Sequence, residues 1–213
     1  NNLFIQTMQK KIIIIDYGMG NLRSVQKKIQ RLGLDAEITS DIDTIVHAYK
    51  LILPGVGHFT NGVIKLKESG IWDVLNKTVL EKKTPIFGIC LGMQLMAISS
   101  EEGNAEGLGW FDADVIKFRV RDQLKYKVPH IGWNNAVVNK ESVLFQGISE
   151  EAMFYFVHSY HIKCNDEQDI LTTTEYEYPF TSSIQKGNIF GTQFHPEKSH
   201  DLGGIVLRNF INI

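Results

Sequence analysis

Residues 84–99 read TPIFGICLGMQLMAIS and contain the transition on which the fold depends. The first part, TPIFGIC (84–90), is apolar without alternation, as is typical of a strand buried on both faces of a sheet. The second part, LGMQLMAIS (91–99), carries apolar residues at helical spacing. We therefore expect a strand that passes directly into a helix at Cys90.

The same order of strand and helix recurs towards the N-terminus. KIIIID (11–16) is a β-branched run that predicts a buried strand, and Asn21 is placed to cap a helix that ends before Gly33. LILPG (51–55) predicts another buried strand, and helical spacing follows over 59–80. Strands that alternate with helices indicate a parallel sheet with right-handed crossovers.

The second half of the chain has a different pattern. Strand-like segments separated by turn residues replace the alternation, and helical spacing returns only at 203–211. GNAEGLG (103–109) is predicted as a loop. We expect an α/β fold with a mostly parallel, flavodoxin-like sheet flanked by helices, to which the second half adds antiparallel strands. These added strands are expected over 113–120, 134–139, 153–163, 170–176, 182–186 and 189–194.

Length and composition limit the class of protein. The 213 residues carry a net charge of −2 without a basic block, which argues against a nucleic-acid partner. Apolar runs such as Ile12–Ile15 are far shorter than the roughly 20 residues of a membrane helix. Only two cysteines occur, without metal-type spacing, and no secretory signal is recognisable. We expect a cytoplasmic protein that needs no metal or cofactor and does not bind a membrane.

The N-terminal residues 1–7 read NNLFIQT. They are similar to an altered protease-cleavable tag of the ENLYFQS type, although a natural extension is the alternative. No linker of Pro, Gly or Ser divides the remainder. We therefore expect one domain over 8–213.

The segment Gly88-Ile89-Cys90-Leu91-Gly92 has the pattern of a nucleophile elbow. Glycines on both sides let a strand turn sharply into a helix, so the nucleophile projects at the helix N-terminus. Unpaired N–H groups and the helix dipole favour a thiolate there, and the N–H of Leu91 is placed to face an oxyanion. The alternative is a buried structural cysteine, which is the commonest role of a free cysteine.

A thiolate nucleophile requires a base and a group that orients the base. Seven histidines compete for the role of base. His195 ends an apolar strand, and Glu197 follows two residues later, where strand alternation places both side chains on one side. The glycine turn at Pro54-Gly55-Val56-Gly57 also follows a buried strand and allows backbone N–H groups to approach a ligand.

Three motifs together, GICLGMQ (88–94), LPGVG (53–57) and HPEKS (195–199), resemble the class I, or triad-type, glutamine amidotransferases. The resemblance extends over nearly all of 11–212. Within that class, the chain is similar to the glutaminase subunits of imidazole glycerol phosphate synthases. This second resemblance rests on DYGMGNL (16–22), PHIGWN (129–134) and FVHSYH (156–161).

The resemblance implies specific roles for residues of this chain. Cys90, His195 and Glu197 would form the catalytic triad, and the N–H groups of Val56 and Leu91 the oxyanion hole. L-Glutamine would be held by Gln94 and by the backbone of Gly55, His158 and Ser159. The partner would be contacted by Asn21, Trp133, Tyr155 and Lys198.

The resemblance also implies a partner chain. No P-loop and no dinucleotide fingerprint follow a strand, so the ammonia acceptor would bind to a separate chain. That chain would be a HisF-type cyclase, a (β/α)8-barrel synthase, in a heterodimer that serves histidine biosynthesis. Its substrate would be a phosphoribulosyl-formimino aminoimidazole carboxamide ribotide. Its products would be imidazole glycerol phosphate and an aminoimidazole carboxamide ribotide.

One departure and three alternatives accompany this interpretation. The usual HSYY or HTYR segment is HSYH here, and we expect the change at His161 to affect partner contacts alone. The alternatives are a paralogous subunit that supplies ammonia for sugar amidation in surface glycans, a stand-alone γ-glutamyl hydrolase, and a binding protein with a decayed site. The intact Cys90, His195 and Glu197 argue against the last.

Overall fold

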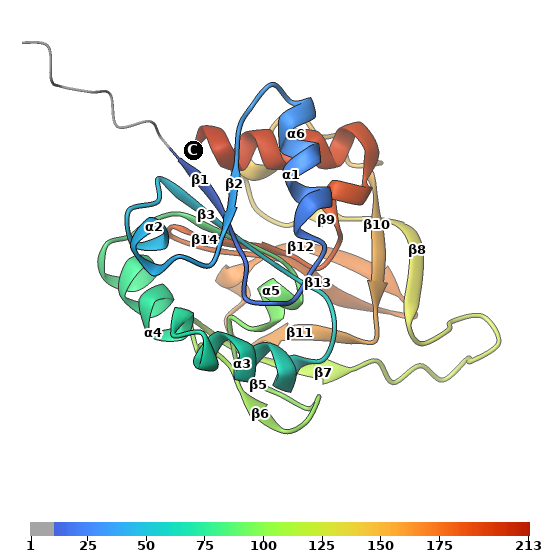
Figure 1. Cartoon of the computed structure of the whole chain (residues 1–213). Helices are drawn as coiled ribbons and strands as arrows, with labels where there is room; N and C mark the ends of the chain where they lie inside the picture. The colour runs from blue at the N-terminus through green and yellow to red at the C-terminus, as the bar shows by residue number, and fades with distance from the viewer. Residues whose placement is uncertain (1–10) are drawn as a thin grey trace, which may run out of the picture.

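The computed structural model describes residues 11–213, and the expectation of a tag over 1–7 lies outside them. A large mixed sheet with helices on both faces forms its centre (Figure 1). Neighbouring strands in the first part of the sheet are all parallel. Their order is flavodoxin-like. Across the sheet they are β2 (Glu37–Thr39), β1 (Ile12–Ile15), β3 (Lys50–Gly55), β4 (Ile86–Cys90) and β14 (Ile189–Thr192).

The remaining strands extend this sheet beyond β14. Their pairings are antiparallel except for that of β5 with β7. Two further strands, β8 (His130–Asn135) and β10 (Met153–His158), form a separate antiparallel ribbon. The expected fold class is therefore confirmed. The added strands are β13 (Tyr178–Lys186), β11 (Tyr160–Cys164), β7 (Phe111–Lys117), β5 (Ala97–Ser100) and β6 (Ala105–Glu106). In addition, β12 (Ile170–Tyr176) pairs with β13, and β9 (Val137–Val138) pairs with β12.

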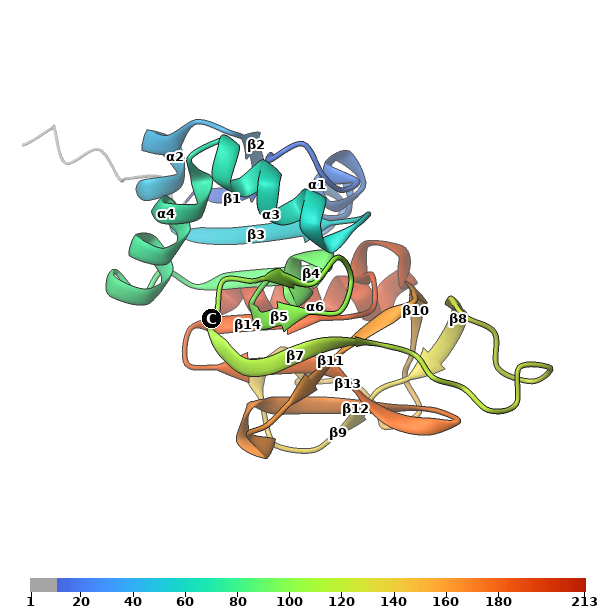
Figure 2. The ribbon, with the colours of Figure 1, turned by 90° about the horizontal axis from the view of Figure 1, so that it is seen from below.

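Strand β1 shows how the sheet builds two cores. Successive side chains point to opposite faces of a strand, and all four isoleucines of β1 are buried. Ile12 and Ile14 pack with α1 (Leu22–Arg31) and α6 (His200–Asn212), which lie side by side (Figure 1). Ile13 and Ile15 belong to the other core, with α2 (Ile42–Val46), α3 (Phe59–Glu68) and α4 (Ile71–Leu75) (Figure 2). The prediction of a strand buried on both faces is correct.

Four local predictions differ from the structure. Residues 189–194 were expected among the added antiparallel strands, but β14 pairs parallel with β4 and belongs to the parallel part of the sheet. The helix expected over 91–99 ends early, because α5 covers only Leu91–Gln94 and β5 begins at Ala97. The helix expected over 59–80 divides at Gly70, whose positive φ of 73° ends α3; α4 and a π-helical turn, Asn76–Glu81, follow. The loop 103–109 contains the short strand β6.

The parallel strands bring their carboxyl ends to one edge of the sheet. There β3 ends at Gly55 and β4 at Cys90, and these two residues face each other in register. The strand order reverses beside β1, which is where open α/β sheets form their binding crevices. Asn21 caps α1 at this edge by accepting a hydrogen bond from Ser24 N over 3.4 Å. Within 11–213, no helix has the length and apolar character needed to cross a membrane.

Candidate active site

Cys90 occupies a strained turn between β4 and α5. Its φ of 54° and ψ of −109° lie outside the conformations that residues with a side chain normally adopt. Steric contacts explain why glycine is required on both sides of Cys90. A Cβ at Gly92 would lie 1.7 Å from the carbonyl oxygen of Leu53, and one at Gly88 would lie 2.7 Å from the backbone nitrogen of Met93. This is the geometry expected of a nucleophile elbow.

His195 and Glu197 form a buried pair next to this turn. The chain leaves β14, which is parallel to β4, and the backbone N–H of His195 donates to the carbonyl of Tyr155 over 2.9 Å. Nδ1 of His195 lies 2.8 Å from Oε1 of Glu197, and both side chains are almost completely buried. Nε2 of His195 has no hydrogen-bond partner in the described chain, which leaves that nitrogen to act on a reacting group.

The electrostatics of His195 favour a charged imidazole. Burial opposes the charge, but Cys90 and Glu197 outweigh it and raise the pKa of His195 to about 10. At neutral pH the imidazole of His195 is therefore charged, and the Glu197 carboxylate holds it beside Cys90. Acylation of Cys90 would remove its contribution, so the pKa of His195 would fall and the ring could accept a proton.

A cavity of about 520 Å³ opens over Cys90. It includes the predicted oxyanion residues Val56 and Leu91 and the predicted ligand residues Gln94, His158 and Ser159. Gly55 is not among the lining residues, because it lies beneath Val56, packed against Tyr17 and Leu91. Asn21, Gly57, Glu102, Pro129, Val157, Tyr160 and Lys198 complete the lining.

The amide of Gln94 is fixed by protein groups. Its Nε2 donates to the carbonyl of Tyr160 and to Oε1 of Gln193, each over 3.0 Å. Both amide hydrogens are therefore used. Any contact of Gln94 with a ligand must use Oε1 as an acceptor.

His158 has no free ring nitrogen. Its Nδ1 lies 2.7 Å from the carbonyl of Tyr160, and its Nε2 lies 3.1 Å from Nδ1 of His130. Burial holds the pKa of His158 well below its usual value, so the ring is neutral. The expectation that His158 serves a ligand through its backbone agrees with this arrangement.

Two residues of the candidate site were not predicted from the sequence. Gln193 is fully buried, and its Nε2 donates to Sγ of Cys90 over 3.4 Å. Strand alternation places Gln193 on the same side of the chain as His195. This spacing could have indicated Gln193, but only histidines and carboxylates were considered as partners of the thiol. Glu102 lines the cavity, and its carboxylate accepts a hydrogen bond from the N–H of Phe59 over 2.8 Å. A carboxylate in this position can bind the ammonium group of an amino acid.

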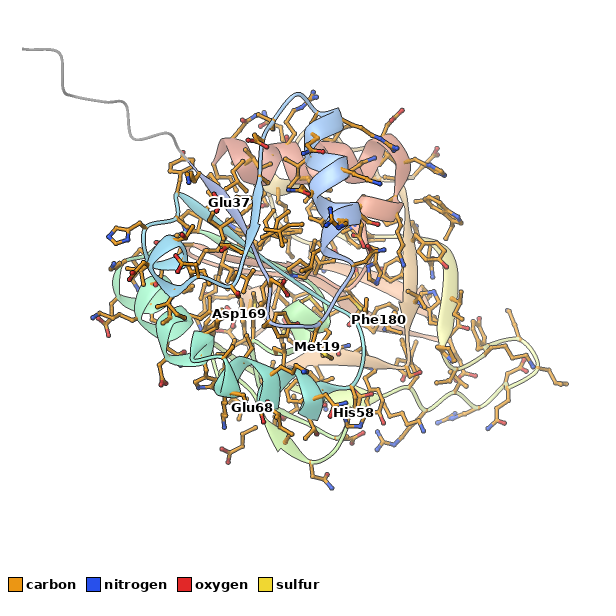
Figure 3. All side chains as sticks on the ribbon, in the orientation of Figure 1. Met19, Glu37, His58, Glu68, Asp169 and Phe180 are labelled. Carbon is orange, nitrogen blue, oxygen red and sulfur yellow. The ribbon has the colours of Figure 1, made fainter. Side chains whose placement is uncertain are left out.

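His161 corrects one expectation. Its side chain is buried, and its ring centroid lies 4.6 Å from that of Phe118, with Tyr178 and Phe180 also in contact (Phe180 is labelled in Figure 3). Burial lowers the pKa of His161 to about 4. The residue is part of an aromatic core beside the cavity, so its effect is on packing and not on partner contacts.

The four residues expected at a partner surface lie in two adjacent places. Asn21 and Lys198 line the cavity, and Nζ of Lys198 lies 5.8 Å from the ring centroid of Tyr155. Trp133 and Tyr155 face each other in register on the β8–β10 ribbon, with ring centroids 5.9 Å apart. Trp133 is 41% exposed, so it is not a core residue.

The loop after β1 packs on the predicted oxyanion segment. A Cβ at Gly57 would lie 2.9 Å from Cε of Met19, which is labelled in Figure 3. A Cβ at Gly20 would lie 3.3 Å from Cα of Gly55. The backbone of 54–57 is therefore enclosed on its inner side by residues 17–20.

Acyl transfer from an amide through a cysteine thioester is the chemistry that this fold and this arrangement of thiolate, imidazole and carboxylate support. A family model described as "Glutamine amidotransferase class-I" matches residues 13–213. The chain belongs to the class I glutamine amidotransferase family, as the sequence motifs predicted.

Curated relatives cover nearly the whole chain. "Imidazole glycerol phosphate synthase subunit HisH 2" of Methanococcus maripaludis is 52% identical over 94% of this chain and 98% of its own length. The protein of the same name from Pseudomonas aeruginosa is 45% identical, over 95% of this chain and 99% of its own length. "Imidazole glycerol phosphate synthase subunit HisH 1" of Campylobacter jejuni is 45% identical, over 95% and 100%.

Solved structures with low identity share the fold. PurLQS from Thermotoga maritima matches with a TM-score of 0.71 at 16% identity, over 96% of this chain and 99% of the other. The glutaminase domain of CTPS from Trypanosoma brucei, solved with bound acivicin, matches with a TM-score of 0.64 at 16% identity, over 95% and 94%.

Proposed function

We propose that this chain is the glutaminase subunit of an imidazole glycerol phosphate synthase. It hydrolyses L-glutamine to glutamate and ammonia and supplies the ammonia to a separate (β/α)8-barrel cyclase subunit. The observation that carries the proposal is the position of Cys90. Its thiol ends a strained strand-to-helix turn at a 520 Å³ cavity and is electrostatically coupled to the buried His195–Glu197 pair.

The acylation step follows from the charge state of the site. The Cys90 thiolate attacks the carboxamide carbon of glutamine, and the N–H groups of Val56 and Leu91 stabilise the oxyanion. The imidazolium of His195 donates its Nε2 proton to the departing nitrogen, so ammonia leaves and a γ-glutamyl thioester remains. Loss of one oxyanion donor typically costs roughly 3–4 kcal/mol of transition-state stabilisation.

Deacylation reverses the role of His195. The thioester carries no charge on sulfur, so the neutral ring accepts a proton from water as that water attacks the thioester carbonyl. Collapse of the second tetrahedral intermediate releases glutamate and restores the Cys90 thiolate. Glu197 holds Nδ1 of His195 throughout, which keeps Nε2 directed at the reacting groups.

Substrate recognition is assigned to groups that line the cavity. The Glu102 carboxylate complements the α-ammonium of glutamine, and Oε1 of Gln94 is an acceptor for an N–H of the ligand. The backbone of His158 and Ser159 completes the binding surface.

The partner is assigned to the face formed by Trp133, Tyr155 and Lys198, which borders the cavity. Aromatic residues are enriched among those that dominate binding energy. A cyclase bound on this face closes the cavity from water and receives ammonia directly.

The numbered names of the relatives favour a second candidate. The relatives from Methanococcus maripaludis and Pseudomonas aeruginosa are named HisH 2, and that from Campylobacter jejuni is named HisH 1. A paralogous subunit of the same chemistry would supply ammonia to a cyclase-like partner for sugar amidation in surface glycans.

A glutaminase assay with each candidate partner distinguishes these functions. Ammonia-dependent imidazole glycerol phosphate formation with a histidine-pathway cyclase supports the first proposal. Coupling only to a glycan-pathway partner supports the second. Full turnover by the chain alone favours a stand-alone γ-glutamyl hydrolase.

A further inference from the structure

Tyr17 carries a buried hydroxyl that has no hydrogen-bond partner within residues 11–213. The residue directly follows the end of β1, and only 3% of its surface is exposed. An unpaired buried hydroxyl typically costs roughly 1–3 kcal/mol of stability. Packing does not explain its presence, because phenylalanine fills the same volume without this cost.

The hydroxyl lies against the backbone that precedes Val56. A Cβ at Gly55 would fall 2.5 Å from Oη of Tyr17 and 2.9 Å from the backbone nitrogen of Gly92. Gly55 is also the register partner of Cys90. The unpaired donor thus lies against Gly55, the residue that precedes Val56.

Peptide geometry gives this donor a defined acceptor. In a trans peptide the carbonyl of Gly55 and the N–H of Val56 point in opposite directions. When the Val56 N–H faces the cavity, as an oxyanion hole requires, the Gly55 carbonyl faces the interior, where the Tyr17 hydroxyl lies. In this structure the Tyr17 hydroxyl has no acceptor among the described residues, so it is available to such a carbonyl.

We propose that Tyr17 is a positioning residue for the oxyanion hole, and that its hydroxyl donates to the Gly55 carbonyl when the Val56 N–H turns towards the oxyanion. This inference rests on the proposed glutaminase function and deepens it. The hydrogen bond forms only in the working orientation, so it lowers the barrier to reaction without strengthening the binding of glutamine.

The test is Tyr17→Phe in the full chain, assayed alone and with a candidate cyclase. We expect a decrease in kcat of about 10- to 100-fold, with KM for glutamine within about twofold of the wild-type value. Alkylation of Cys90 by iodoacetamide needs no oxyanion hole and should keep its rate. The Tm should be unchanged or higher, because the substitution removes an unpaired buried hydroxyl.

The matched control is Tyr126→Phe, which alters a tyrosine on the segment between β7 and β8 that extends from the body of the protein (Figures 1 and 2). This variant should retain wild-type kcat. A wild-type kcat in Tyr17→Phe overturns the inference and leaves the glutaminase function intact. A parallel fall in Tm, alkylation rate and kcat also overturns it, because the role is then structural. Absence of glutamine hydrolysis by the wild-type chain with every candidate partner overturns both proposals.

Discussion

The side-chain amide of Gln193 donates to Sγ of Cys90 over 3.4 Å, while Oε1 of the same amide accepts from Gln94 over 3.0 Å. The Cys90 sulfur is therefore the end of a buried chain of hydrogen bonds that begins at the Tyr160 carbonyl. A donor directed at sulfur stabilises the thiolate relative to the thiol. The contact from Gln94 fixes the orientation of the Gln193 amide, because it leaves Nε2 to face Cys90.

Gln193→Glu should slow the alkylation of Cys90 at neutral pH. The substitution replaces a donor with a carboxylate, so the rate–pH profile for iodoacetamide should move up by about one to two pH units. Gln193→Met, which removes the donor without adding charge, should give a smaller shift. Gln168→Glu, at an exposed position, is the control for the added charge. An unchanged profile in both Gln193 variants would contradict a role for this amide.

Cys90→Ala should abolish glutamine hydrolysis, whereas Cys164→Ala should leave it nearly unchanged. Burial, with Asp169 as a smaller contribution, raises the pKa of Cys164 to about 12, so this thiol is protonated and unreactive at neutral pH. Ammonia-dependent synthesis by the partner should survive in Cys90→Ala, because free ammonia bypasses the glutaminase. Mass spectrometry after treatment with a glutamine-like electrophile checks the assignment. Labelling of Cys164 alone would show that the nucleophile is misassigned.

The buried ring of His161 should make the protein sensitive to acid. Burial lowers the pKa of His161 to about 4, against 6.5 in the unfolded chain. Between these values the unfolded chain binds more protons, so the free energy of unfolding decreases as the pH falls. At pH 5 this one residue removes about 2 kcal/mol of stability relative to pH 8.

His161→Phe keeps the aromatic ring and removes the titration. Urea unfolding at pH 8 and pH 5 should therefore show a smaller loss of stability in His161→Phe than in the wild type. His47→Phe, at an exposed position, should behave like the wild type. Equal acid sensitivity in wild type and His161→Phe would mean that this histidine is not the origin of the effect.

Trp133→Ala should weaken the coupling of ammonia release to synthesis more than it weakens glutamine binding. Trp133 is 41% exposed, and its ring stacks on that of His200 at 4.8 Å and faces Tyr155 at 5.9 Å. Its truncation therefore removes an ordered aromatic surface without opening the core. Ammonia lost per synthesis product is the measurement, and Ile64→Ala on α3, also exposed, is the control. Unchanged stoichiometry would place the partner on another face.

The pattern of apolar residues predicted the alternating strands and helices of the first half of the chain. The isoleucines of β1 and the helix that Asn21 caps follow directly from local rules of burial and capping. The helix expected over 91–99 was wrong beyond Gln94, because a continuous run of buried residues has the same composition in a helix and in a strand. Pairing with β7, a distant segment, decides that Ala97–Ser100 is extended.

The candidate site was predictable where chemistry depends on residue type. Cys90, His195 and Glu197 belong to the few residue types able to serve as nucleophile, base and orienting group, and the structure brings them together. Gln193 and Tyr17 could not be found in this way, because amides and phenols are common and only their burial and direction give them a role. The burial of His161 likewise depends on Phe118, which lies on another segment of the chain.

The last prediction concerns activation. We expect the chain alone to be a poor glutaminase whose rate rises by orders of magnitude when a liganded partner binds. Ammonia released into water is lost, and the peptide between Gly55 and Val56 can hold either a carbonyl or an N–H towards the oxyanion. A difference of about 4 kcal/mol in transition-state stabilisation between these orientations corresponds to roughly a thousandfold in rate. A partner that binds the working orientation more tightly shifts the population towards it.

Gly55→Ala tests this switch. A Cβ there would lie 2.5 Å from Oη of Tyr17 and 2.9 Å from Cβ of Leu91, so the segment must shift outwards. Partner-stimulated turnover should fall by about 100-fold or more, while alkylation of Cys90 by iodoacetamide should be largely retained. Gly204→Ala on α6, where an added Cβ meets only side-chain atoms of Leu32 and Lys28 at 3.1 Å or more, controls for the loss of a glycine. The decisive measurement is turnover of the wild-type chain without a partner, because a rate equal to that of the complex would leave nothing for a switch to control.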